Sequence, residues 1–153
     1  MVFVPMPFSA AVVLRGGRGP SVLQGFAATP SLLAGLGSDA GDEADYAALN
    51  AAGVAALEGL TGPRRLILAV EAAAQQVLDA RTELGEVRVE AVRWDQVRAL
   101  FADGPEAAPA VAAAAEAAAG VALDRVLELP AVVELGETID LLWYATGELD
   151  DLG

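Results

Sequence analysis

The sequence predicts a single α+β domain, loosely α/β, in which a mixed sheet of five or six strands packs with about four helices. Three observations support this prediction. The chain has 153 residues, the length of one typical domain. Short apolar or alternating runs, typical of strands, are interleaved with segments of helical periodicity. No shift in composition marks a second domain, so we expect one domain over residues 1–153.

The expected strands are short segments with continuous or alternating apolar side chains. The continuous apolar run 66–70 indicates a central strand covered on both faces. In segment 87–91, Val87 and Val89 alternate with charged residues, a pattern typical of a half-exposed strand. The other strand candidates are 2–4, 21–29, 97–102, 132–135 and 139–145.

The expected helices begin where a capping residue, a proline or acidic residues precede an apolar spacing of three or four. Ser9 is expected to cap a short helix that runs through residue 14. Pro30 suits the first turn of a helix over 31–35. A longer helix begins at Asp42, where acidic residues complement the helix dipole, and ends before Gly62. Further helices are expected over 72–79, 104–119 and 122–129.

Three connecting segments are expected to lack regular structure. Residues 15–20 form a loop rich in glycine and arginine, and residues 37–41 form a polar turn. The acidic segment 147–153 is expected to be a loosely ordered tail.

The composition removes many kinds of catalytic site, because the chain contains no histidine, no cysteine and no lysine. Ser-His-Asp triads, Cys-His dyads, thiolate zinc sites and Schiff-base lysines are therefore excluded. Any chemistry must use carboxylates, arginines, hydroxyls or a borrowed cofactor. The absence of lysine fits the coding bias of an Ala-, Gly- and Arg-rich chain, so it is not itself a functional signal. We favour a protein without catalytic activity and expect no cofactor.

The net charge of −13 indicates which partners are compatible with the surface. Nucleic acids and anionic membranes both require basic surface, so we expect direct binding to neither. The apolar start of the chain lacks a basic segment and contains two prolines, unlike a signal peptide. We expect a cytoplasmic protein whose candidate partner is a protein with a basic surface. The sequence leaves the oligomeric state open.

Carboxylates form two clusters, and each has a structural and a functional interpretation. The densest run contains Asp39, Asp42, Glu43 and Asp45, which a hard cation such as Mg²⁺ could use. Its spacing does not match an EF-hand loop, so we favour charges at a helix start and expect no metal site. The second cluster is near the end of the chain and includes Glu148, for which solvated acids are the favoured interpretation.

Arginines and aromatic residues supply the other candidate binding residues. Arg15 and Arg18 flank two glycines in a loop that could hold a phosphate or carboxylate, although a surface loop paired with acids is the favoured interpretation. Trp143 and Tyr144 are adjacent, so on a strand they point to opposite faces and one can be an exposed interface anchor. Tyr46 is a further candidate on the long helix.

Six blocks of sequence, in order over nearly the whole chain, resemble a known family: 2–5, 26–32, 45–49, 64–70, 94–103 and 142–149. The last block, Leu-Trp-Tyr followed by an acid and an aliphatic residue, is the most specific. The blocks resemble an uncharacterised family of small acidic proteins from high-GC Gram-positive bacteria, described as a domain of unknown function. The resemblance implies a cytoplasmic protein and transfers no activity or site residue. Segment 130–138 is longer than the family pattern.

Two hypotheses about function follow. The favoured one is a non-enzymatic binding or regulatory protein that contacts a protein partner through an acidic, aromatic surface. The alternative is a small-molecule-binding protein or an enzyme that uses only carboxylate, Arg and Tyr groups. The candidate partner- or ligand-binding residues are Trp143, Tyr144, Glu148, Tyr46, Arg15 and Arg18.

Overall fold

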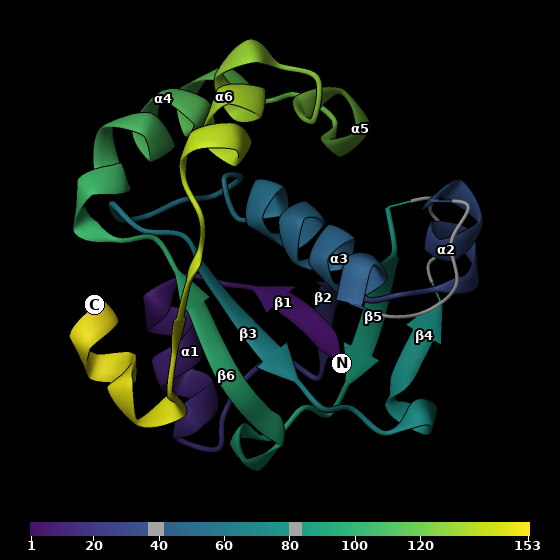
Figure 1. Ribbon diagram of the computed structural model, residues 1–153. Coiled ribbons are helices and arrows are strands. Elements are labelled where there is room, and N and C mark those ends of the chain that lie inside the picture. The colour runs from purple at the N-terminus through teal and green to yellow at the C-terminus, as the bar shows by residue number, and fades with distance from the viewer. Residues whose placement is uncertain (37–41, 80–83) are drawn as a thin grey trace.

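The computed structural model describes residues 1–36, 42–79 and 84–153, and its centre is one antiparallel sheet (Figure 1). The sheet has seven strands in the order β4-β5-β2-β1-β3-β6-β7. Every pairing between neighbouring strands is antiparallel. The strands are β1 (Val2–Pro5), β2 (Val22–Phe26), β3 (Leu66–Val70), β4 (Val77–Asp79), β5 (Glu86–Glu90), β6 (Val97–Ala102) and β7 (Leu142–Tyr144).

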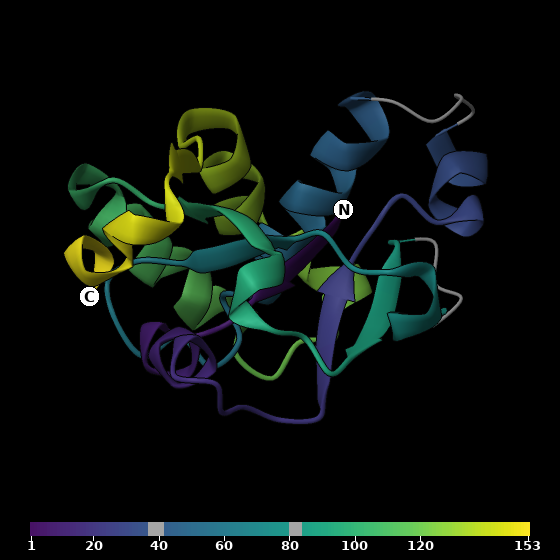
Figure 2. The ribbon, with the colours of Figure 1, turned by 90° about the horizontal axis from the view of Figure 1, so that it is seen from below.

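Helices cover both faces of this sheet. The α-helices are α1 (Phe8–Arg15), α2 (Pro30–Leu36), α3 (Asp42–Ala55), α4 (Ala108–Ala118), α5 (Leu123–Val126) and α6 (Pro130–Thr138). Short 3-10 helices are η1 (Ala74–Gln76), η2 (Trp94–Gln96), η3 (Pro105–Ala107) and η4 (Thr146–Leu152). Figure 2 shows α1 on one side of the sheet and α3 on the other. Helices α4, α5 and α6 gather beyond one end of the sheet (Figure 1).

The central strand β3 explains why the core has two halves. All five of its residues are buried, as the continuous apolar run predicts. Leu66, Leu68 and Val70 belong to the half of the core that includes α1 and η4. Ile67 and Ala69 alternate with them and pack in the half under α3. A third apolar cluster lies among α4, α5 and α6.

Several sequence predictions of architecture need correction. The sheet is antiparallel rather than mixed, and the expected five or six strands and four helices are too few. Residues 77–79 form strand β4 instead of completing a helix over 72–79. The Gln76 side chain accounts for this change, because its amide donates to the carbonyls of Glu90 and Ala91 and fixes the chain beside β5.

Segment 132–135 also needs correction, because it lies in helix α6 rather than in a strand. Pro130 occupies the first turn, where its fixed φ favours a helix. Val132 and Leu135, three residues apart, are the buried positions of α6 and belong to the cluster with α4. The spacing of three therefore explains this segment better than the apolar run does.

The element ends differ from expectation by a few residues. Helix α1 begins at Phe8 after Pro7 and has no side-chain cap, so Ser9 does not act as its N-cap. Where a loosely ordered tail was expected, residues 146–152 form η4, whose Leu149 and Leu152 are buried. The expected polar turn over 37–41 lies outside the described residues. Within the described ranges, no helix is both long and apolar enough to cross a membrane.

Candidate functional site

Strand β7 is an edge of the sheet and carries the most exposed large apolar side chain of the described residues. Trp143 is 61% exposed and its neighbour Leu142 is 43% exposed. Tyr144 is half-buried and packs against the core half that includes α1 and η4. The two adjacent aromatic residues thus lie in different environments, as opposite faces of a strand require.

The backbone of Trp143 also faces outward, which follows from the pattern of hydrogen bonds across the sheet. The Met6 N–H donates to the Leu66 carbonyl (3.1 Å), so Leu66 and every second residue of β3 bond to β1. The residues between them bond to β6, where one partner is Phe101. The neighbours of Phe101 therefore bond to the two residues that flank Trp143. The N–H and C=O of Trp143 are directed away from β6, at the free edge.

Glu148 limits this edge at one end. Its carboxylate accepts a hydrogen bond from the Ala145 N–H at 2.7 Å, at the start of η4. Ala145 lies two residues after Trp143, so alternation would direct its N–H to the same edge as that of Trp143. Glu148 therefore fixes η4 against β7 and occupies the next donor along the edge. Its observed contact is structural.

Arg15 and Arg18 differ in their contacts. Arg15 donates a hydrogen bond to Asp150 at 2.9 Å and forms an ion pair with it, which ties α1 to η4. This hydrogen bond, with the charge of Arg15, lowers the pKa of the Asp150 carboxyl below its usual value. Arg18 is exposed in the loop after α1. The guanidinium of Arg15 is thus already engaged by a carboxylate.

Tyr46 is separate from the β7–η4 group. It lies on α3, is 58% exposed, and lines a groove of about 620 Å³ between α3 and α6. Leu141 also lines the groove and lies two residues before Trp143. The groove and the β7 edge are therefore neighbouring parts of the α3 side of the molecule.

The acidic run at the start of α3 supports its structural interpretation. Asp42, Glu43 and Asp45 lie in the first turn of α3, where carboxylates complement the helix dipole. Asp39 lies outside the described residues. Among the described residues, no group of three or more acidic side chains is arranged to hold a metal ion.

Sequence comparison gives the family of the chain. The model of a family of unknown function, DUF6912, matches residues 1–152. The chain belongs to that family. The match to DUF6912 assigns no activity, so the function must be argued from the structure itself. Comparison with curated proteins and with solved structures gave no match.

One polar feature of this DUF6912 protein was not identified from the sequence: a buried ion pair between Arg65 and Asp103. Both Nε and Nη2 of Arg65 donate to the Asp103 carboxylate at 2.9 and 2.8 Å, and the Arg65 backbone N–H donates to it at 2.8 Å. Asp103 is fully buried and Arg65 is 5% exposed. No local sequence pattern records this pair, because it depends on the register that places Arg65, before β3, opposite Asp103, after β6.

Proposed function

We propose that this protein is a cytoplasmic, non-enzymatic binding protein that accepts an extended, basic segment of a protein partner alongside β7. The exposed Trp143 on an edge strand carries the proposal. Tryptophan is enriched among residues that dominate binding energy at protein interfaces. An incoming strand would bond to the outward N–H and C=O of Trp143 and contact its indole.

Charge supports a basic partner. The net charge of −13 attracts cationic segments and repels a second copy of the same chain. Asp140 precedes β7 and Glu148 follows it, and both side chains are exposed. A partner with lysines or arginines flanking its apolar residues would therefore be preferred to one with acids.

A direct test uses a blocked peptide of alternating valine and lysine, with a valine–glutamate peptide of the same length as its control. Isothermal titration calorimetry should show binding of the lysine peptide alone, weaker at moderate than at low salt. Trp143→Ala should weaken binding by about 30-fold, since hot-spot tryptophans contribute about 2 kcal/mol or more.

Tyr46→Ala is the matched control, because Tyr46 is an aromatic residue of nearly equal exposure on a helix. It should leave the affinity unchanged. Equal affinity of wild type and Trp143→Ala would overturn the proposal, and a loss confined to Tyr46→Ala would move the interface to the α3–α6 groove. Self-association of the free protein through β7 would also contradict it.

A further inference from the structure

Inside the sheet, the pairing between the neighbouring strands β1 and β2 is incomplete. β1 and β2 are neighbours, yet they pair only at Phe3 and Phe26. β2 pairs with β5 over all five of its residues, and β1 pairs with β3 over all four of its own. The two strands therefore diverge after one pair, and each remains attached to its other neighbour.

The sequence explains the divergence. The register of the Phe3–Phe26 pair places Pro5 opposite Gln24. Proline has no N–H, so Pro5 cannot donate the hydrogen bond that would continue the ladder. Next to Gln24, the two strands approach each other closely: a Cβ added to Gly25 would lie 2.7 Å from Cγ1 of Val2. Gly25, which has no side chain, permits this close approach, and Pro5 ends the pairing of the two strands.

The backbone of Gln24 faces the resulting gap. Ala27 donates to the Gly85 carbonyl and Ala91 donates to the Ser21 carbonyl, both at 2.9 Å. Odd-numbered residues of this stretch therefore bond to β5, and Gln24 directs its N–H and C=O toward β1. With no pairing there, a donor and an acceptor of one residue are presented together, as at a free sheet edge.

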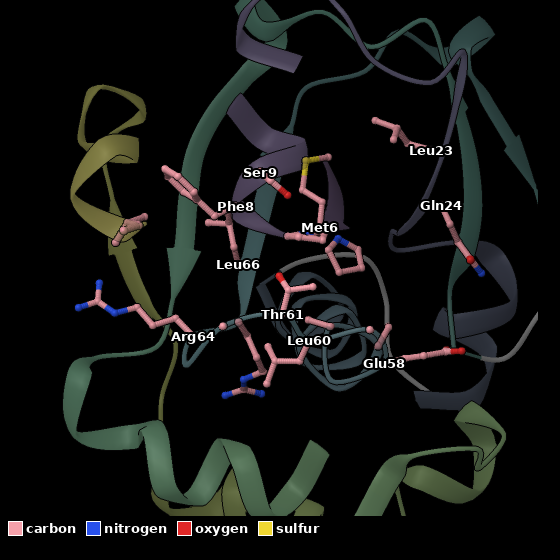
Figure 3. A pocket seen from close by; sticks show the side chains of 18 of the residues that line it. Met6, Phe8, Ser9, Leu23, Gln24, Glu58, Leu60, Thr61, Arg64 and Leu66 are labelled. Atoms are coloured by element: carbon pink, nitrogen blue, oxygen red, sulfur yellow. The ribbon is translucent and has the colours of Figure 1, made fainter. Parts of the chain in front are cut away.

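A pocket of about 540 Å³ occupies this gap. Figure 3 shows Met6 and Ser9 at the start of α1 above Leu60 and Thr61 of the loop after α3, with Leu23 and Gln24 of β2 to one side. Its volume is that of a site for a small molecule, and its walls combine apolar side chains with a few polar groups. The other apolar lining residues include Phe8, Leu66 and Leu152.

Four charged residues line the pocket: Glu58, Arg64, Arg65 and Glu86. Arg65 lines the pocket but is neutralised by Asp103. The guanidinium of Arg64 points away from Met6 and Gln24 (Figure 3). Glu86 accepts a hydrogen bond from the Gln24 side chain at 3.2 Å. Glu58 is exposed to solvent, so its charge is hydrated rather than buried in the pocket. The two carboxylates disfavour an anion, and the apolar walls favour an uncharged ligand over an ionic one.

We propose that the gap between β1 and β2 binds a short, uncharged, apolar peptide-like molecule, such as an N-acylated apolar amino acid amide. The N–H and C=O of one ligand residue pair with those of Gln24, as in an antiparallel ladder, and its apolar side chain lies on the face of the Gln24 side chain, near Ala56 and Leu60. This site is independent of the β7 edge and takes a different class of ligand.

The probe is N-acetyl-leucine methylamide, titrated into the ¹⁵N-labelled full chain and followed by NMR. We expect saturable shifts at Gln24, Ser9 and Thr61, and none at Trp143. The same compound methylated on the leucine nitrogen has lost the donor to Gln24 and should bind about tenfold more weakly or worse.

Two substitutions of Gln24 test the backbone pairing. Gln24→Ala retains the N–H and should bind the probe within about threefold of wild type. Gln24→Pro removes the N–H that faces the gap, leaves the bonds of β2 to β5, and should abolish binding. Equal binding by these two variants, or by the methylated probe, would overturn the proposal.

Filling the pocket gives a second test that does not depend on how Gln24→Pro folds. Thr61 is exposed and faces the pocket, so Thr61→Phe should block the probe without disturbing the core. Thr138→Phe, at an exposed threonine of α6 outside the pocket, is the matched control and should bind normally. Unchanged binding by Thr61→Phe, or no binding by wild type, would contradict the site. Neither result would bear on peptide binding at β7.

Discussion

The β7 edge and the gap between β1 and β2 both leave backbone groups of the sheet without a partner strand, and their surroundings differ. Each presents the backbone N–H and C=O of one residue, Trp143 at the edge and Gln24 in the gap. Trp143 is 61% exposed. Gln24 instead faces a pocket walled by α1 and the loop after α3. The same set of free groups therefore suits a macromolecule in one place and a small molecule in the other.

The β7 edge and the gap also differ in origin. The gap results from two backbone constraints, the missing N–H of Pro5 and the close approach of β1 to β2 at Gly25. Among the described residues, β7 is the last strand at its end of the sheet, and Glu148 shortens this edge by bonding to Ala145. Substitutions in one region should therefore leave binding in the other unchanged, unless they act on an element that both regions share.

The largest expected effect comes from the buried ion pair, which supports both regions. Arg65 lines the gap, and Asp103 directly follows β6, the strand that holds β7. Asp103→Ala leaves the Arg65 guanidinium buried without its counter-charge. We expect the free energy of unfolding to fall by about 3–5 kcal/mol, measured by urea denaturation, with loss of binding at both regions.

The exposed ion pair between Arg98 and Glu71 provides the control for that experiment, since both side chains are more than half exposed. Glu71→Ala should cost at most about 1 kcal/mol. If the two variants were equally stable, the buried pair would not be the shared support of the two regions.

A smaller and more local effect is expected from Gly25→Ala. The added methyl group would meet the side chains of Val2 and Val4 of β1, so β1 or these side chains must shift. Overpacking of this kind costs about 1–3 kcal/mol, and the gap should change shape. We expect weaker binding of N-acetyl-leucine methylamide and unchanged binding of the lysine peptide at β7.

Gly62→Ala is the matched glycine control, because nothing lies within 4 Å of the added methyl group and Gly62 also lines the pocket. It should leave the unfolding free energy nearly unchanged. If Gly62→Ala lowered the free energy of unfolding as much as Gly25→Ala, the close approach of β1 and β2 would not be the reason for the loss of stability.

Features set by local pattern were predictable from the sequence, and features set by contacts between distant segments were not. The apolar run of β3 and the alternation in β5 gave the correct strands, because burial on two faces or on one leaves a clear pattern. β4 is a strand through its pairing with β5 and the bonds of Gln76, which no local pattern records.

The same distinction applies to the candidate residues. Trp143 and Tyr144 were singled out because adjacent strand residues face opposite ways, and the structure places them in different environments. The gap was not identified, since it depends on which residue of β2 lies opposite Pro5. The Arg65–Asp103 pair likewise requires the register of β3 and β6.

The smallest expected effect is a pH dependence of η4, the element that joins the two regions. η4 begins directly after β7 and ends at Leu152, which lines the gap. The hydrogen bond from Arg15, then its charge, lowers the pKa of Asp150 below its usual value of 3.8. A carboxyl with a depressed folded-state pKa contributes stability above its unfolded pKa and loses it as the pH falls through the folded value.

Asp150→Asn should therefore lower the melting temperature slightly at pH 7, and the difference from wild type should shrink below about pH 3.8. Because Arg15 anchors the part of η4 nearest the gap, binding of the neutral probe should weaken more than binding of the lysine peptide. A difference in melting temperature that persisted unchanged to pH 2 would mean that the Asp150 charge does not hold η4 in place.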